Sequence, residues 1–178
     1  MKMFFRKHIV AILLAFSLLL AACGGATPPS GAFAGKVDGS DAFIAVVLHT
    51  DGTVTAYVCD GLAVAEWFKG NANGNSLDLT NADGATLNAT TAADSFSGTF
   101  TPVGGSALNF SVSVVTEPEG LWRLDETVDG VDYVTGWVVL PDGDVRGLTR
   151  GGGTTQPPAS SDPKSVKGTT WVDPAPQP

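Results

Sequence analysis

The sequence predicts an all-β fold, an antiparallel meander of about 8–10 short strands that forms a closed or nearly closed β-barrel. Apolar residues recur at every second position in short segments, which is typical of strands with one buried face. Asp-Gly pairs, which suit tight hairpin turns, lie between these segments. No long helical pattern follows the N-terminal region. A β-sandwich is the alternative architecture.

Residues 1–22 are expected to be a signal peptide that is removed. Three basic residues precede an apolar run from Ile9 to Leu20, and small residues then lead to Cys23. A basic start, an apolar stretch and a small-residue cleavage site follow one another in this order in secretory signals. The apolar run is shorter than the roughly 20 residues that a membrane-spanning helix needs.

The residues Leu20-Ala21-Ala22-Cys23 resemble the lipobox of bacterial lipoproteins. The resemblance implies cleavage between Ala22 and Cys23 and lipidation of the Cys23 thiol. Two or three acyl chains, at about 0.8 kcal/mol per buried CH₂, hold a protein durably on a membrane. The lipobox resemblance therefore implies a lipid anchor in the cell envelope. The anchor would lie on the periplasmic side of an outer membrane or on the outer face of the cytoplasmic membrane. Residues 23–31 would be the lipidated cysteine and its tether.

Residues 32–150 are expected to form a single β domain. The segment 107–115 is the clearest strand, because four apolar residues share one face and polar residues alternate with them. These residues are Leu108, Phe110, Val112 and Val114. The expected strands, in chain order, lie in segments 42–49, 53–58, 62–70, 74–80, 85–90, 95–100, 107–115, 121–128 and 131–140. Turns are expected at Asp51-Gly52, Asp83-Gly84, Asp129-Gly130 and Asp142-Gly143.

Residues 151–178 are expected to be a largely disordered tail. They contain six prolines and no periodic apolar face, so burial cannot offset the entropy lost on ordering. Trp171 and Val172 offer the alternative that this segment adds as a strand to a sheet edge.

The charge balance excludes one class of partner. Beyond residue 22 the chain has seven Lys and Arg against 18 Asp and Glu, a net charge of −11. Nucleic-acid binding needs basic side chains to neutralise phosphates. We therefore expect no nucleic-acid partner.

Few residues beyond residue 22 could act as a catalytic nucleophile, a general base or a metal ligand. Beyond residue 22 the only histidine is His49, which is expected in an exposed turn. Cys59 lies on an expected strand and is expected to be buried, and lipidation of Cys23 would leave it no partner for an intrachain disulfide. One histidine and one cysteine are too few for a zinc site. We expect no metal or cofactor site and single out no catalytic residue.

Carboxylates crowd around one expected turn. They are Asp125, Glu126, Asp129 and Asp132. The spacing of a calcium-binding EF-hand loop is absent. If Asp129-Gly130 forms the turn, Thr127 faces Asp132 and Glu126 faces Tyr133, which divides the carboxylates between two faces. Solvated surface is the favoured interpretation.

Four aromatic residues are possible ligand-lining groups. They are Trp67, Trp122, Tyr133 and Trp137. Small β-barrels can enclose one small molecule among such side chains. Filling a core is the commoner role of each.

The stretch from "AYVCDG" through "AEWFKG" to "VDGVDYVTGWVVLPDG" resembles an uncharacterised β-rich domain of bacterial lipoproteins and secreted proteins. That resemblance covers most of residues 36–147 and implies no activity. The architecture is also similar to lipocalin- and avidin-like barrels. "GAFAGKVDG" lacks the lipocalin Gly-x-Trp signature, so lipocalin-type ligand binding is not implied.

The sequence therefore predicts a membrane-anchored extracytoplasmic lipoprotein that acts as a non-enzymatic binding module for a small molecule or an envelope component. One alternative is an envelope hydrolase that uses carboxylates around residues 125–132. Another is a protein-protein interaction or structural protein of the envelope. An internal cavity lined by Trp67, Trp122 and Trp137 would favour a small molecule, and a solid core with an aromatic patch outside would favour protein contact.

Overall fold

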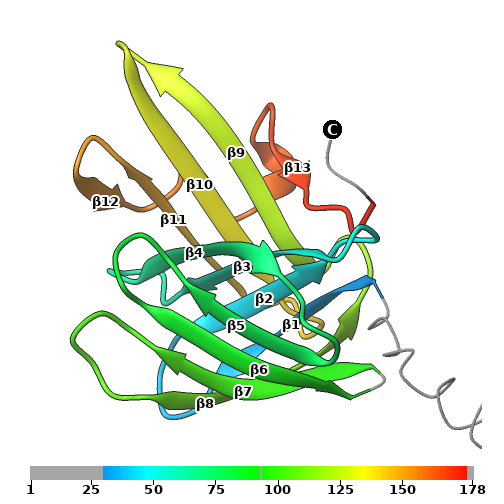
Figure 1. Ribbon diagram of the computed structural model, residues 1–178. Coiled ribbons are helices and arrows are strands. Elements are labelled where there is room, and N and C mark those ends of the chain that lie inside the picture. Colours follow the sequence, from blue (N-terminus) through cyan, green and yellow to red (C-terminus); the bar gives the residue numbers. More distant parts are fainter. Residues whose placement is uncertain (1–29, 93, 176–178) are drawn as a thin grey trace, which may run out of the picture.

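The computed structural model describes residues 30–92 and 94–175, and these residues form an all-β fold of two antiparallel sheets (Figure 1). The first sheet has eight strands in the order β4-β3-β2-β1-β8-β7-β6-β5 and is a nearly closed barrel. Its strands are β1 (Gly31–Val37), β2 (Phe43–Leu48), β3 (Thr53–Cys59), β4 (Ala65–Asn71), β5 (Ser76–Thr80), β6 (Thr86–Ala92), β7 (Ser95–Thr101) and β8 (Leu108–Val115). The predicted fold class, an antiparallel and nearly closed β-barrel, is confirmed.

The barrel is almost entirely a meander, with one pairing that is distant in sequence. Strands β1 to β4 pair in succession, as do β5 to β8, and β1 pairs with β8 to join the two halves. The end strands β4 and β5 meet at a seam, where a Cβ on Gly70 would lie 2.6 Å from Cδ2 of Leu79. The segment 62–70, which the sequence predicts to be a strand, forms one from Ala65 onward, as β4.

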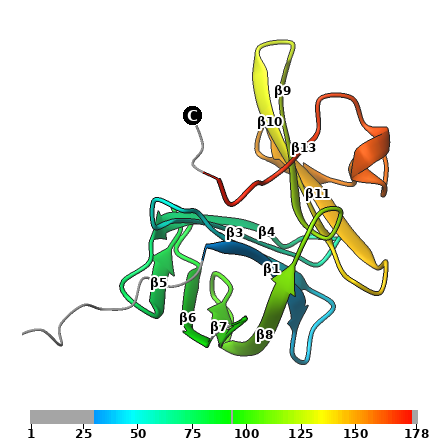
Figure 2. The ribbon, with the colours of Figure 1, turned by 90° about the vertical axis from the view of Figure 1, so that its right-hand side faces the viewer.

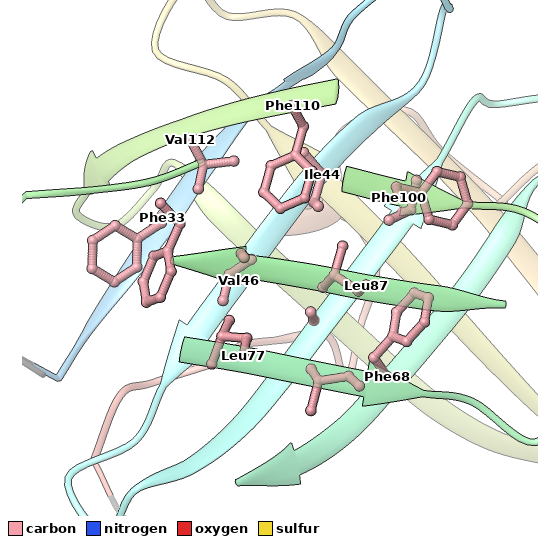
Figure 3. Close-up of a cluster of buried hydrophobic side chains, with 14 of the residues drawn as sticks. Phe33, Ile44, Val46, Phe68, Leu77, Leu87, Phe100, Phe110 and Val112 are labelled. Carbon is pink, nitrogen blue, oxygen red and sulfur yellow. The ribbon is translucent and has the colours of Figure 1, made fainter. Parts of the chain in front are cut away.

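Apolar side chains fill the interior of the barrel (Figure 3). Phe33 and Phe96 meet edge to face with their ring centroids 4.7 Å apart, and Phe68 and Phe100 do so at 6.2 Å. Ile44, Leu77 and other aliphatic side chains occupy the space between the rings, and all of these residues are buried. The alternation of apolar and polar residues in the sequence follows from this one filled face.

The second sheet has five strands in the order β12-β11-β10-β9-β13. Its strands are β9 (Gly120–Val128), β10 (Val131–Val139), β11 (Val145–Gly151), β12 (Thr154–Gln156) and β13 (Thr170–Trp171). The β9–β10 hairpin turns at Asp129 and Gly130, which both have positive φ angles, as predicted for this Asp-Gly pair. Its turn end projects beyond the barrel (Figure 1).

A second apolar cluster joins this sheet to the outer wall of the barrel. Ala45, Tyr57 and neighbouring side chains on the outer faces of β1 to β4 pack against Leu121, Val138 and Leu148 of the second sheet. Because side chains alternate between the faces of a strand, Trp137 lies on the opposite face of β10 from Val138, turned away from the barrel. A second sheet packed on the barrel was not predicted, because alternation within a strand does not show which sheet the strand joins.

The expectation of a disordered tail is wrong for residues 151–175. After β12 the chain crosses the face of the second sheet that is turned away from the barrel and forms the short 3₁₀ helix η1 (Pro163–Ser165) (Figure 2). It then adds β13 to the edge of β9, where Trp171 is opposite Trp122. Residues 176–178 lie outside the described part of the chain.

Isolated contacts, and not a periodic apolar face, hold this C-terminal segment. Nε1 of Trp137 donates a hydrogen bond to the carbonyl oxygen of Ser160 at 2.9 Å, and Pro163 is buried. Nε1 of Trp171 donates to the carbonyl oxygen of Glu119 at 2.8 Å. The backbone N–H of Thr50 donates to the carbonyl oxygen of Pro174 at 3.0 Å. Periodicity could not reveal such partners, because they are single groups distant in sequence.

Among the described residues, no helix has the length and apolar character needed to cross a membrane.

Candidate binding cleft between the barrel and the second sheet

A cleft lies where the outer wall of the barrel at β4 meets the base of the β9–β10 hairpin. It consists of two adjoining concavities of about 350 Å³ and about 310 Å³ that share Lys69 and Arg123. The first is lined by Trp67, Lys69, Thr80, Asn81, Ala82, Arg123 and Val134, and the second by Thr55, Lys69, Arg123, Asp125, Thr170, Trp171 and Val172. We call these two concavities the inter-sheet cleft.

Strand alternation places Trp67 and Lys69 on the cleft side of β4. Phe68 between them fills the barrel, so its two neighbours point outward. Trp67 is the cross-strand partner of Tyr57, and their ring centroids are 4.3 Å apart. A Cβ on Gly136 of β10 would lie 2.6 Å from both of these rings, so a glycine is needed for the second sheet to approach.

Arg123 enters the cleft from β9 in a fixed orientation. Nε and Nη2 of Arg123 donate hydrogen bonds to Oδ2 and Oδ1 of Asp125, each at 2.6 Å. Cζ of Arg123 lies 4.6 Å from the ring centroid of Trp67, a cation–π geometry. The guanidinium has further N–H donors, which bond no residue in the described part of the chain. Arg123 is therefore held on two sides and still offers donors to a ligand.

The Arg123 side chain also fixes the charge of its partner. Hydrogen bonds from Arg123 lower the pKa of the Asp125 carboxyl below its ordinary value, against the opposing effect of partial burial. The charge of nearby Lys69 acts in the same direction. Asp125 is consequently a carboxylate at neutral pH. Lys69 is exposed and forms no salt bridge with any residue that the structure describes.

The inter-sheet cleft is a positively charged site on an acidic protein. Two of the seven Lys and Arg residues beyond residue 22 line it, with Asp125 as its one acidic group. The cleft thus has an excess of positive charge, whereas the chain beyond residue 22 has a net charge of −11.

One buried polar group at the cleft has no partner. Nε1 of Trp67 is buried and has no hydrogen-bond acceptor among the described residues. Leaving such a donor unsatisfied costs about 1–3 kcal/mol. Exceptions of this kind call for a specific explanation, such as a bound water or a functional role.

The interior of the barrel is filled by buried apolar side chains of the described residues. Its side chains are close-packed, whereas the five best-formed clefts of the described residues have volumes from about 90 to about 540 Å³. Each is open to solvent, and none is lined by residues of the barrel interior.

The four aromatic residues singled out in the sequence do not converge on one cavity. Trp67 lines the inter-sheet cleft, and Trp122 lines a separate cleft of about 400 Å³. Trp122 and Trp137 are cross-strand partners, and each donates its indole N–H to a backbone carbonyl. Tyr133 packs over Gly151, where a Cβ would lie 2.4 Å from its ring.

The expectation that His49 is exposed is wrong. The residue is only 3% exposed, because the C-terminal segment returns to cover it. Its Nδ1 lies 3.2 Å from the carbonyl oxygen of Ala175, and its Nε2 lies 3.1 Å from Oγ1 of Thr55. Since a carbonyl only accepts hydrogen bonds, Nδ1 carries a proton. His49 thus fastens the C-terminal segment to the barrel.

Cys59 is buried, as predicted, within the cluster between the barrel and the second sheet. Burial raises the pKa of its thiol from 9.0 to about 11. A thiol that stays protonated is a poor nucleophile. Cys23 and Ala22, the expected lipidation and cleavage residues, lie outside the described residues.

The carboxylates of the β9–β10 hairpin are divided between its two faces, as predicted from the sequence. Thr127 is opposite Asp132, and Glu126 is opposite Tyr133. Oγ1 of Thr127 donates a hydrogen bond to Asp132 at 2.7 Å. In the described ranges, no group of three or more His, Cys, Asp or Glu side chains is placed to hold a metal ion.

Lys69 and Arg123 were not among the predicted site residues. Arg123 and Asp125 are two residues apart on an expected strand, so they were bound to share a face, and this was a usable signal for an ion pair. The position of Lys69 and Trp67 against them depends on how the two sheets pack. No protein-family model, curated protein or solved structure matches this chain.

Proposed function

We propose that this protein is a bacterial lipoprotein of the cell envelope whose β domain binds an envelope component at the inter-sheet cleft without catalysing a reaction. The observation that carries the proposal is the filled interior of the barrel, beside an open cleft with unused donor groups on its outer wall. A ligand carried inside a barrel needs a hollow interior. An open cleft suits part of a larger molecule that extends beyond it.

The lipobox resemblance supports the location. The sequence between Cys23 and the first described residues is only a few residues long. Lipidation of Cys23 would therefore keep the cleft close to the membrane, where envelope components are concentrated. No nucleic acid is proposed as a ligand, because the excess of acidic residues disfavours one.

The geometry does not favour the hydrolase alternative. A glycosidase needs two carboxyl groups in one cleft, one of them with a raised pKa. The cleft has one carboxylate, Asp125, and Arg123 lowers its pKa and occupies both of its oxygens.

A specific observation favours protein contact as a second candidate. The β9–β10 hairpin projects beyond the barrel, and its tip exposes Val128 at 48% and Val131 at 36% (Figure 1). These two side chains share the hairpin face opposite to the one that borders the cleft.

The anchor is tested with two cysteine variants. Wild-type protein should be found in the membrane fraction, with an N-terminal peptide whose mass includes acyl chains on Cys23. The Cys23→Ser variant should lose both properties, and the Cys59→Ser variant should keep them. An intact, unacylated wild-type chain in the soluble fraction would contradict the proposal.

The cleft is tested with two matched valine variants of the same hairpin. Val134→Trp places a large side chain in the inter-sheet cleft, whereas Val131→Trp enlarges the opposite face. Sedimentation of the acylated protein with isolated envelope polymers should be weakened by Val134→Trp alone. Loss with Val131→Trp alone would instead favour contact through the hairpin tip.

A further inference from the structure

We infer that the inter-sheet cleft binds an anionic group, a carboxylate or a phosphate, carried on a saccharide polymer of the envelope. This inference rests on the binding function proposed above and names the ligand chemistry of the same cleft. It is carried by Lys69, by the fixed geometry of Arg123 and by the hydroxyl groups around them.

Arg123 is prepared to bind an anion before any ligand arrives. Asp125 and the ring of Trp67 hold its guanidinium in place, so little further side-chain freedom is lost on binding. Its remaining N–H donors are in the fixed fork that matches a carboxylate or a phosphate.

Lys69 supplies the second positive charge. Arg123 is already paired with Asp125, so Lys69 is the unbalanced charge of the cleft. Both concavities are lined by Lys69 and Arg123, so a ligand in either one lies beside both cations. A single anionic group between them would satisfy both.

The neutral lining suits the rest of a saccharide. Thr80 lines one concavity, and Thr55 and Thr170 line the other. The Thr55 hydroxyl already donates to Nε2 of His49. The Thr170 hydroxyl donates to the carbonyl oxygen of Arg123. Their oxygens can still accept hydrogen bonds from sugar hydroxyls on either side of the anion. The ring of Trp67 is already covered by Tyr57 and Arg123, so it supports the arginine instead of stacking on a sugar.

The acidic surface disfavours ligands whose negative charges are closely spaced. A net charge of −11 beyond residue 22 repels dense polyanions, and salt screens this repulsion only beyond about 8 Å at physiological ionic strength. The cleft itself attracts one anionic group at short range. A polymer with well-separated anionic groups fits this combination.

The test measures binding of three oligomers to the full-length acylated protein in neutral detergent micelles. The probes are a malto-oligosaccharide with one carboxylate group, the same oligosaccharide with one phosphate group, and the unmodified malto-oligosaccharide as the neutral control. At least one anionic probe should bind, and the one that binds identifies the source of the anion. The malto-oligosaccharide should bind at least about tenfold more weakly.

Three variants assign that binding to the cleft. Lys69→Gln and Arg123→Lys should each weaken it by about tenfold or more, the first by losing a charge and the second by losing the fork. Lys167→Gln removes the same charge from an exposed lysine outside the five clefts and should leave the affinity within about twofold. Because Lys69 is exposed, Lys69→Gln should fold normally. It therefore tests the cleft even if Arg123→Lys disturbs the packing on Trp67.

Two results would overturn the inference and leave the proposed function standing. One is equal binding of the neutral and anionic probes, and the other is unchanged affinity in Lys69→Gln and Arg123→Lys. Failure of all three probes would also overturn it, and sedimentation with envelope polymers then decides the proposed function separately.

Discussion

The barrel and the second sheet bury aromatic residues of different kinds. Every aromatic side chain inside the barrel is a phenylalanine: Phe33, Phe68, Phe96, Phe100 and Phe110. All four tryptophans and both tyrosines of the chain lie outside that interior. Phenylalanine needs no hydrogen-bond partner, whereas buried indole and phenol groups usually do. The barrel core is therefore complete in itself.

The second sheet depends on backbone groups from loops and from the C-terminal segment. Trp137 bonds to Ser160, and Trp171 bonds to Glu119. Tyr57 reaches from the barrel wall to the carbonyl oxygen of Leu148 at 3.4 Å. The difference shows that the molecule consists of a self-contained barrel and an attached sheet that remote segments fasten.

The largest effect is expected inside the barrel. Phe96→Ala would leave a cavity against Phe33 and should lower the free energy of unfolding by about 3–5 kcal/mol. Val114→Ala, at a half-exposed position of the same sheet, should have a smaller effect, below about 1 kcal/mol. Urea denaturation followed by far-ultraviolet circular dichroism measures both. Equal effects of the two substitutions would show that the interior is not close-packed.

A smaller effect, confined to the second sheet, is expected on deletion of residues 157–178. The deletion removes the partner of the Trp137 indole N–H, the β13 pairing and the buried Pro163, which together should lower the stability of this sheet by about 2–4 kcal/mol. Because every remaining tryptophan lies outside the barrel interior, tryptophan fluorescence should report this loss selectively. The fluorescence transition should move to lower urea than the circular dichroism transition. Coincident transitions at the wild-type midpoint would show that the segment does not stabilise the sheet.

The same division explains what the sequence could predict. Barrel strands pair mostly with their sequence neighbours, and their alternation and Asp-Gly turns are local signals. The C-terminal segment has no such signal, because Ser160 and Pro174 act through single carbonyl groups on distant partners. His49 therefore looked like an exposed turn residue.

The candidate site was predictable in part. Arg123 and Asp125 share a strand face by simple alternation, so their pairing is a local property. Their approach to Trp67 depends on Gly136, whose missing side chain admits two rings from another sheet. A lone glycine in a strand signals close approach without naming its partner.

An intermediate effect on stability is expected at that glycine. Gly136→Ala forces a methyl group against Trp67 and Tyr57 and should lower the stability by about 1–3 kcal/mol. Gly147→Ala imposes a similar clash on Trp137 at the other face of the sheet. If the cleft binds as proposed, Gly136→Ala should weaken binding of the anionic probe and Gly147→Ala should not. Equal weakening by both variants would show that overall sheet stability, and not cleft geometry, controls binding.

The smallest energetic effect concerns Cys59, at the boundary between the two regions. Burial raises the pKa of its thiol from 9.0 to about 11, so the folded protein has about a hundredfold less thiolate than an unfolded chain below this range. A thiol reagent should therefore modify the native protein at least about a hundredfold more slowly than the unfolded protein. Deletion of residues 157–178 should increase the rate before circular dichroism reports unfolding of the barrel.

The sign of the pH dependence follows from the same raised pKa. The unfolded chain releases the thiol proton near 9.0, and the folded chain retains it until about 11. Over this interval the folded state binds more protons, so the contribution of Cys59 to the free energy of unfolding decreases as the pH rises. Cys59→Ala should remove this contribution, and urea midpoints measured across the interval in both proteins test it. An identical alkaline slope in the variant would mean that other groups control the slope. Because Cys59 lies against the second sheet, a slope that appears in fluorescence before circular dichroism would place the first loss of structure at the junction of the barrel and that sheet.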